Sequence, residues 1–524
     1  MILEKLKQFC FRSVNTGFAF ATAAIVILIL LNAANHYVNM VDFNMAAVFL
    51  FLLFAAALTA GGYFLCEKCG IRSILAKHPF LILTAVMLTV CIAHILIVRA
   101  IYTPIGWDVA AIINAAGNLH PEETKDLDIY FTRYPNNVLM TALFKVFFKI
   151  VQPAISDVWL SSALLSVLAV DVGIVLISLT AKRVFGLKVY YLTLWLCLLL
   201  IAVNPTIYVP YSDAVAMPFT AGFLFSAAML LTAKTQRVKF IFSFTAGLFL
   251  FAGYYIKPTV LIAGIAAFLL LALSIPKMES KRILTYGLCV LLLIAGGLSS
   301  FALNRAARPL VYSQLPTEQQ QNALEVPMSH FIMMGLNERE GYYGFFQEDV
   351  NNTFAISGKE EKTDYHKEVI AKRLQDFGVL GFLKHCIHKA IWVTTDGTFL
   401  YGGEGIFHAG TPKKTDGLAG FLQKFTYTNT DLYQNYFGNY MQAIWLLIVF
   451  GMALLLRRQG KERPQAQNGL LFIMQMATGG LILFLVLFEA RSRYLFLYLP
   501  YFALLAAVGY QTLFQRLRAW REES

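Results

Sequence analysis

The run "PFLILTAVMLTVCIAHILIV", residues 79–98, decides the fold class. It is apolar and carries no Asp, Glu, Lys or Arg, and an α-helix needs about 20 such residues to cross the hydrocarbon core of a bilayer. The whole chain of 524 residues is 58% hydrophobic and only 14% charged, whereas soluble domains are about 25% charged. The sequence therefore predicts a protein embedded in a membrane.

Apolar runs of similar length recur along the chain and predict an all-α polytopic membrane protein with about 12 transmembrane helices. The expected spans are residues 16–36, 45–65, 79–98, 156–181, 189–204, 213–232, 240–256, 258–275, 283–303, 441–456, 470–488 and 494–513. The basic start "MILEKLKQFCFR" runs on into the first span without a small-residue cleavage site, so we interpret it as part of that span.

The charges between the spans predict which side each connection faces. The expected inner segments are residues 1–12, 66–78, 181–188, 233–239, 275–282, 457–464 and 516–524. They hold 22 of the 43 Lys and Arg residues but only 6 of the 31 Asp and Glu residues. Because Lys and Arg concentrate on the cytoplasmic side, we expect both termini in the cytoplasm. The same asymmetry accounts for the net charge of +12 without a nucleic-acid partner.

Two long polar stretches fall outside and divide the chain. The expected regions are N-terminal spans (1–98), a first large outer loop with juxtamembrane helices (99–155), central spans (156–303), an extracytoplasmic domain (304–440), and C-terminal spans with a basic tail (441–524).

Both outer regions have helical patterns. "NNVLMTALFKVFFKIV" (136–151) is short and amphipathic, so we expect a helix along the outer membrane surface. "DYHKEVIAKRLQDFG" (364–378) predicts a helix that Gly378 ends, and "GFLKHCIHKAIWVTTDG" (381–397) predicts a second amphipathic helix. The extracytoplasmic domain is therefore expected to be small and mainly helical.

The unusual polar residues beside the spans gather at the outer ends. They are Asp108 after the third span, Asp213 at the start of the sixth, Lys257 between the seventh and eighth, and Glu489, Arg491 and Arg493 between the last two. Positive charge is disfavoured in outer loops, so the three basic residues oppose the topological trend.

Glycosyl transfer from a lipid-linked phosphosugar would use such residues. The acceptor hydroxyl loses a proton as it attacks the anomeric carbon, and a carboxylate is a suitable general base. The transition state has oxocarbenium character, which nearby negative charge stabilises. Arg and Lys stabilise a departing lipid phosphate, and one Arg can bind two of its oxygens.

Each of these residues also has a structural interpretation. Asp108 and Asp213 each precede a helix-like run and could cap it. Lys257 could extend its amine toward the membrane surface. Arg491 and Arg493 could both pair with Glu489 in an ordinary turn.

Three further acids allow alternatives. Asp171 lies inside a span, in "LAVDVGIVLI", where an ionisable side chain is a functional candidate or a hydrogen-bonded structural residue. Asp126 and Asp128 form a D-x-D pair that could hold a divalent metal, but a solvated acidic loop is the commoner meaning of so short a pattern. A divalent metal is therefore possible, and no other cofactor is indicated.

Several short motifs together resemble a known group. "GWD" (106–108), "YSDA" (211–214), the basic turn at Lys257 and "EARSRYLF" (489–496) resemble the GT-C superfamily of integral membrane glycosyltransferases. "RYPNN" (133–137) and "MMGLN" (333–337) are similar to Gram-positive members near the protein mannosyltransferase-like proteins. The motifs are short, and their order along the chain supports the resemblance.

The resemblance implies an extracytoplasmic active site, a polyprenyl-phosphate sugar donor and inversion at the anomeric carbon. It makes Asp108 the catalytic acid of the first loop and Asp213 the second acidic position. Its implied donor-phosphate group is Lys257, Arg491 and Arg493, with Glu489, Trp107, Tyr134 and Asn137 in support. The chain departs from the family by two extra spans before Asp108 and by lacking the paired acidic motif after the first span.

The expected function is transfer of a sugar to a cell-surface polymer, glycolipid or protein at the outer face of a bacterial cytoplasmic membrane. The expected partners are the lipid-linked donor, a glycan or protein acceptor and the bilayer. The alternatives are a transporter or flippase of lipid-linked sugars, or a lipid-linked glycan polymerase or ligase. Transporters often have internal repeats and midplane binding residues, whereas these polar residues lie at one face.

Overall fold

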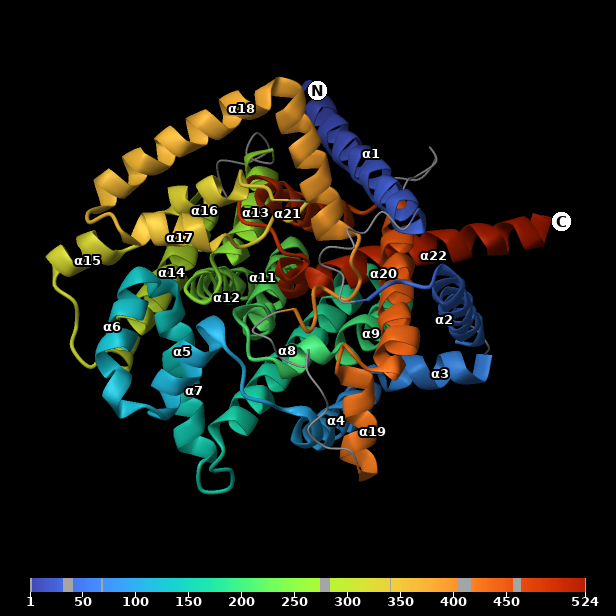
Figure 1. Cartoon of the computed structure of the whole chain (residues 1–524). Helices are drawn as coiled ribbons and strands as arrows, with labels where there is room; N and C mark the ends of the chain where they lie inside the picture. Colours follow the sequence, from blue (N-terminus) through green and yellow to red (C-terminus); the bar gives the residue numbers. More distant parts are fainter. Residues whose placement is uncertain are drawn as a thin grey trace.

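The computed structural model describes most of the chain (Figure 1). The described residues are 2–31, 41–66, 69–273, 283–339, 341–403, 416–455 and 463–523. Within these ranges the structure is helical apart from connecting segments and one isolated bridge, between Arg339 and Tyr342. The chain is therefore an all-α protein.

Ten helices in the described part are long and apolar enough to cross a membrane, and two shorter apolar helices accompany them. In chain order the twelve are α1 (Ile2–Leu30), α2 (Met45–Leu65), α4 (Pro79–Ile101), α8 (Val158–Phe185), α9 with η3 (Leu187–Cys197, Leu198–Ala202), α10 with α11 (Ser212–Val215, Met217–Leu231), α12 (Gln236–Tyr254), η5 with α13 (Pro258–Val260, Leu261–Ala272), α14 (Ile283–Val311), η8 with α20 (Tyr433–Phe437, Gly438–Ala453), α21 (Gln465–Leu487) and η9 with α22 (Ser492–Tyr498, Leu499–Glu523).

These twelve segments coincide with the twelve predicted spans, so the predicted polytopic fold is confirmed. The boundaries differ most at α1, which begins at Ile2 instead of residue 16, and at α22, which continues to Glu523 instead of residue 513. A helix need not end where the hydrocarbon ends, because its backbone hydrogen bonds continue equally well in a polar environment. Residues 32–36 of the first predicted span lie outside the described residues.

The remaining helices form the connections. The predicted first outer loop contains α5 (Trp107–Gly117), η1 (Pro121–Glu123), α6 (Thr124–Arg133), η2 (Pro135–Asn137) and α7 (Val138–Val151). The later outer region contains α15 (Glu318–Leu324), α16 (Met328–Gly335), α17 (Gln347–Phe354), α18 (Lys359–Thr394) and α19 (Gly417–Thr426). α3 (Cys69–Lys77) follows α2, and η4 (Pro205–Tyr208) follows η3.

α18 bends sharply at Gly378, as Figure 1 shows. Gly378 has φ 58° and ψ −178°, which an L side chain rarely adopts, so two helices meet here. The predictions of a helix that ends at Gly378 and of a second helix after it are confirmed. α7 is also a helix, as predicted, and it exposes Val146 and Ile150. Its position along a membrane surface stays a prediction.

Polar contacts join inner connections to inner ones and outer connections to outer ones. Near the inner ends, Arg183 Nε donates to Thr232 Oγ1 at 2.8 Å. At the other ends, Asn44 N, just before α2, donates to Asn439 Oδ1, at the start of α20, at 2.8 Å. This is the pattern that twelve alternating spans require. Which end faces the cytoplasm stays a prediction from charge.

α22 lies at the centre of the bundle and α14 at its edge. In the most apolar stretch of η9 and α22, 89% of the residues are buried within the protein, whereas in the corresponding stretch of α14 only 11% are buried. An apolar helix surface that the protein leaves uncovered requires lipid. Glycines allow close packing at two crossings: a side chain at Gly296 would meet the Phe244 carbonyl of α12, and one at Gly509 would meet the Gly451 carbonyl of α20.

Candidate functional site

Asp108 lies in the first turn of α5 without capping it. The N-cap residue is Gly106, which has no side chain to cap the helix, and Trp107 has φ 60°, a left-handed conformation that is uncommon outside glycine. The Asp108 carboxylate instead accepts a hydrogen bond from Tyr130 Oη at 2.8 Å. The capping interpretation of Asp108 is therefore wrong.

Three residues of the segment 130–137 hold this carboxylate in place. Tyr130 Oη accepts a hydrogen bond from Asn137 Nδ2 at 2.7 Å and donates to Asp108. The rings of Tyr130 and Tyr134 lie 5.4 Å apart. The "RYPNN" motif thus contacts Asp108 through Tyr130, a residue that the sequence analysis missed. The sequence signal for Tyr130 was its spacing: Tyr130 lies on α6, four residues before Tyr134, the residue that follows this helix.

The Asp108 side chain is exposed to solvent, while its carboxyl group lies among protein atoms that partly bury it. This burial raises the pKa of its carboxyl group above the ordinary value. The hydrogen bond from Tyr130 and the positive charges of Arg493 and Lys257 act in the opposite direction, and the negative charge of Glu489 adds to the rise. The structure therefore places Asp108 within electrostatic reach of the other outer loops.

Asp213 is completely buried between two cations. Lys257 Nζ lies 2.9 Å from its Oδ1, and Arg493 Nη1 lies 2.8 Å from its Oδ2. Burial lowers the pKa of the Lys257 amine, and the Asp213 charge opposes that change. The N-cap of α10 is Tyr211, so Asp213 does not cap this helix, and Lys257 is not extended toward solvent.

Each of the three basic groups lies against an aromatic ring. Lys257 Nζ is 4.1 Å from the ring centroid of Tyr494. Arg493 Cζ is 3.7 Å from the centroid of Tyr211, and Arg491 Cζ is 5.5 Å from that of Trp107. Cations are attracted to such ring faces, most strongly where water is excluded. The contact between Trp107 and Arg491 joins the first outer loop to the last.

Glu489 completes a group of five charged residues, which we call the outer charge cluster. Its Oε1 accepts from Arg491 Nε at 3.0 Å and from Tyr494 Oη at 3.2 Å. The cluster comprises Lys257, Arg491, Arg493, Asp213 and Glu489, so its formal charge is +1. The side chains of its basic residues are 15%, 9% and 8% exposed. A positive excess held in a region of low water content attracts an anion.

The loop that carries Arg491 and Arg493 is held by α18, in the predicted extracytoplasmic region. Lys389 of α18 is fully buried, and its Nζ donates to the carbonyls of Gly335 and Phe488, each at 2.6 Å. Trp392 Nε1 donates to the Ala490 carbonyl at 3.2 Å. Burial lowers the pKa of Lys389 to about 7. No local sequence signal distinguishes Lys389 from the other lysines of this amphipathic helix.

Both acids of the D-x-D pair lie on α6, and Asp128 is hydrogen-bonded to the segment that follows α14. Asp128 Oδ1 accepts from Ser313 N at 2.9 Å, and its Oδ2 accepts from Gln314 N at 3.0 Å and from the Ser313 hydroxyl. Asp128 therefore ties α6 to the segment after α14, and the interpretation as a solvated loop is wrong for this residue. Asp126 is exposed.

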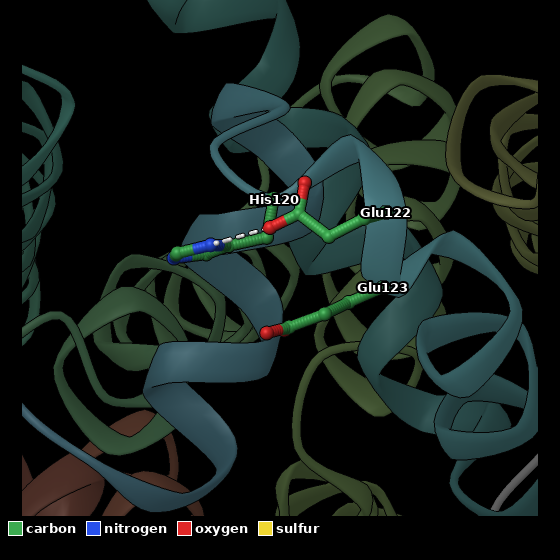
Figure 2. Close-up of side chains that lie close together, drawn as sticks. All are labelled: His120, Glu122 and Glu123. Carbon is green, nitrogen blue, oxygen red and sulfur yellow. Dashed lines mark hydrogen bonds and ion pairs between the residues drawn. The ribbon is translucent and has the colours of Figure 1, made fainter.

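One other group has metal-ligand chemistry among the described residues. His120, Glu122 and Glu123 lie close together on an exposed turn, and His120 Nδ1 is 3.3 Å from Glu122 Oε1 (Figure 2). All three side chains face solvent, where acidic clusters are common without an ion. We assign no metal to them.

Asp171 has a partner that the sequence did not identify. His94 of α4 lies with its Nδ1 3.1 Å from Asp171 Oδ1 and its Nε2 2.8 Å from the Ala202 carbonyl. The histidine therefore joins α4, α8 and η3. This arrangement satisfies the structural interpretation of Asp171.

The fold and these contacts define a polytopic integral membrane protein. The chain belongs to the family described as conserved hypothetical integral membrane protein, whose model matches residues 5–514. No curated protein matches the chain.

Two solved structures are similar. One is ArnT from Cupriavidus metallidurans bound to undecaprenyl phosphate, with 14% identity and a TM-score of 0.34; the match covers 83% of this chain and 77% of that one. The other is ArnT from the same organism in the apo state, with 11% identity, a TM-score of 0.33 and the same coverage.

Proposed function

We propose that this protein is a GT-C type glycosyltransferase. It moves a sugar from a polyprenyl-phosphate donor to a cell-surface polymer, glycolipid or protein at the outer face of the membrane. One observation carries the proposal: Trp107, the neighbour of the exposed Asp108, lies with its ring centroid 5.5 Å from Arg491 Cζ, which belongs to a mostly buried cluster of net charge +1.

The outer charge cluster is suited to a lipid phosphate. Its residues come from connections at the outer ends of spans, where the headgroup of a membrane lipid lies while its chain follows the helices. Arg491 and Arg493 can each offer two parallel N–H donors to phosphate oxygens, and Lys257 adds a third positive charge. Donors that are fixed in advance in a water-poor site stabilise the charge that develops on a leaving phosphate.

Asp108 is the proposed general base. It takes the proton of the acceptor hydroxyl as the hydroxyl oxygen forms a bond to the anomeric carbon. The bond between that carbon and the phosphate oxygen breaks, and its electron pair leaves with polyprenyl phosphate. A single displacement of this kind inverts the anomeric configuration. The raised pKa of Asp108 makes it a stronger proton acceptor than an ordinary aspartate.

The proposed role of Asp213 is to position Lys257 and Arg493. Its side chain is 1% exposed and pairs with both cations, which leaves it no access to an acceptor. Glu489 positions Arg491 in the same way. Tyr130, with Tyr134 and Asn137 beside it, orients the base.

A transporter has less support. The intramembrane acid that would serve transport, Asp171, is engaged by His94 between three helices. The charged residues gather instead at one end of the bundle. A polymerase or ligase that uses a lipid diphosphate would share the site and differ in the donor.

The test compares Asp108→Asn with Asp126→Asn in purified protein reconstituted in nanodiscs. Synthetic short-chain polyprenyl-phosphate sugars serve as donors, membrane polymer from a deletion strain serves as acceptor, and release of polyprenyl phosphate is measured. Loss of a general base lowers the rate by roughly 10²–10⁴-fold, so we expect that loss for Asp108→Asn. Asp126, an exposed acid of the same outer loop, is the matched control and should retain the wild-type rate. Undiminished transfer by Asp108→Asn would refute the mechanism.

A further inference from the structure

A cavity of about 200 Å³ lies between the first outer loop and the outer end of α14. Its walls come from α6, α7, α14 and α15, which group together at the left of Figure 1. The polar side chains that line it are Thr132, Asn304, Arg308, Tyr312, Gln321 and Glu325. None of them belongs to the outer charge cluster.

The cavity offers both hydrogen-bond donors and acceptors. Asn304 Oδ1 is buried and has no hydrogen-bond partner in the described structure. The Arg308 guanidinium lies 5.7 Å from the ring of Tyr312, and Glu325 is paired with Lys359 at 2.7 Å. The Asn304 oxygen is inaccessible to water and so does not face the cavity, whose lining offers the Arg308 guanidinium and the Gln321 amide as donors and the Glu325 carboxylate as an acceptor. An apolar occupant would take Arg308 and Gln321 out of water without giving them hydrogen bonds.

The size of the cavity narrows the class of ligand. One water needs roughly 10–15 Å³ by this measure of volume, so about 200 Å³ has room for roughly a dozen atoms the size of a water oxygen. A single hexose ring is in that range. Its hydroxyl groups both donate and accept, which matches the mixed amide, guanidinium, carboxylate and hydroxyl lining.

The cavity shares a segment with the candidate active site. Thr132 and Pro135 line the cavity, while Tyr130 and Asn137, from the same segment, hold Asp108. A ligand in the cavity therefore contacts the segment that orients the proposed base. A glycan chain bound there would have its next sugar beside this segment.

We propose that this cavity is a subsite for one sugar residue of the acceptor, an inference that rests on the glycosyl transfer proposed above. Arg308, Asn304 and Gln321 are its recognition residues. They select a hydroxyl-rich acceptor, whereas the outer charge cluster binds the donor phosphate.

Binding is tested on the full chain in nanodiscs by saturation-transfer NMR, with glucose, N-acetylglucosamine and glucuronate as probes. We expect at least one sugar to receive saturation from the wild type and from Arg305→Ala. Arg305 is an exposed residue one turn from Arg308 and does not line the cavity, so it is the matched control. Arg308→Ala and Gln321→Ala should each reduce the signal severalfold, at unfolding temperatures that match the control. No signal from the wild type, or equal signals from all variants, would overturn the subsite.

Two further readouts separate this inference from the function on which it rests. Asp108→Asn should bind the probe sugar like the wild type while it no longer consumes donor. Arg308→Ala should raise the KM for acceptor severalfold and leave the KM for donor unchanged. If the wild type consumes donor and Arg308→Ala leaves the KM for acceptor unchanged, the subsite alone is overturned. If the wild type consumes no donor, the proposed function is overturned.

Discussion

The Asp108 side chain is exposed to solvent, yet the protein atoms around its carboxyl group raise its pKa above the ordinary value by reducing its hydration. The hydrogen bond from Tyr130 is the largest effect that acts against this rise. Asn137 Nδ2 donates a hydrogen bond to Tyr130 Oη and so helps to fix the position of the phenol. The geometry of these three residues therefore sets the pH at which the proposed base is ionised.

Replacing Tyr130 by Phe should move the acidic limb of the pH–rate profile to higher pH. The phenol stabilises the charged form of Asp108, so its loss raises the pKa of the carboxyl group further, and less of it is ionised at any pH near that pKa. The measurement is kcat/KM for donor consumption across pH. Tyr365→Phe, which changes a tyrosine on α18 away from Asp108, is the control and should leave the profile unchanged. An unshifted profile for Tyr130→Phe would contradict the role given to this contact.

At the scale of elements, α18 and the loop between α21 and η9 are bonded together. Lys389 and Trp392 of α18 bond to the backbone of residues 488–490. Ser492 Oγ donates to Asp396 Oδ2 at 3.0 Å, just after α18 ends. The positions of Arg491 and Arg493 therefore depend on a helix that precedes them by about a hundred residues.

Lys389→Met should lower both stability and donor turnover. The substitution leaves the Phe488 carbonyl without this donor and the Gly335 carbonyl with His385 Nε2 alone, and an unsatisfied carbonyl costs about 1–3 kcal/mol where no water replaces the donor. The loop then holds the arginines less firmly, so we expect a several-fold lower kcat/KM for donor together with a lower unfolding temperature. Lys384→Met, an exposed lysine on the same helix, is the control. Unchanged kinetics in Lys389→Met would show that the loop keeps its geometry without this clamp.

At the scale of the whole molecule, twelve alternating spans place all residues of the proposed site at one end of the bundle. α22 is enclosed by the other helices, while α1, α2, α4 and α14 expose apolar surface that requires lipid. The charge asymmetry of the connections predicts that the site end faces away from the cytoplasm.

That orientation has a direct test by labelling of single cysteines in a variant that lacks the native ones. A membrane-impermeant maleimide added to intact cells should label Asp126→Cys in the first outer loop. It should fail to label Lys234→Cys, between α11 and α12, until the membrane is opened. Asp126 and Lys234 are both exposed on the protein surface, so labelling of a cysteine there reports which side of the membrane it faces. The reverse pattern would place the proposed site in the cytoplasm.

The helical framework follows from local properties of the chain. A run of about 20 apolar residues crosses a bilayer wherever it occurs, since its backbone must satisfy its own hydrogen bonds in lipid. The bend at Gly378 is also a local property, because it depends on the torsion angles of one residue. The charge bias that predicts sidedness is also a sum over the sequence. These features needed no knowledge of which helices pack together.

The sequence by itself determined the fold class, the twelve helices and the set of outer-end charges from which the site was predicted. Only the tertiary structure decided that Asp213 joins Lys257 to Arg493, that Tyr130 holds Asp108, and that Asp171 pairs with His94. The physical reason is that ion pairs and hydrogen bonds act over about 3 Å between residues far apart in the chain. The packing of the helices sets those distances, and a local sequence pattern does not show which helices pack together.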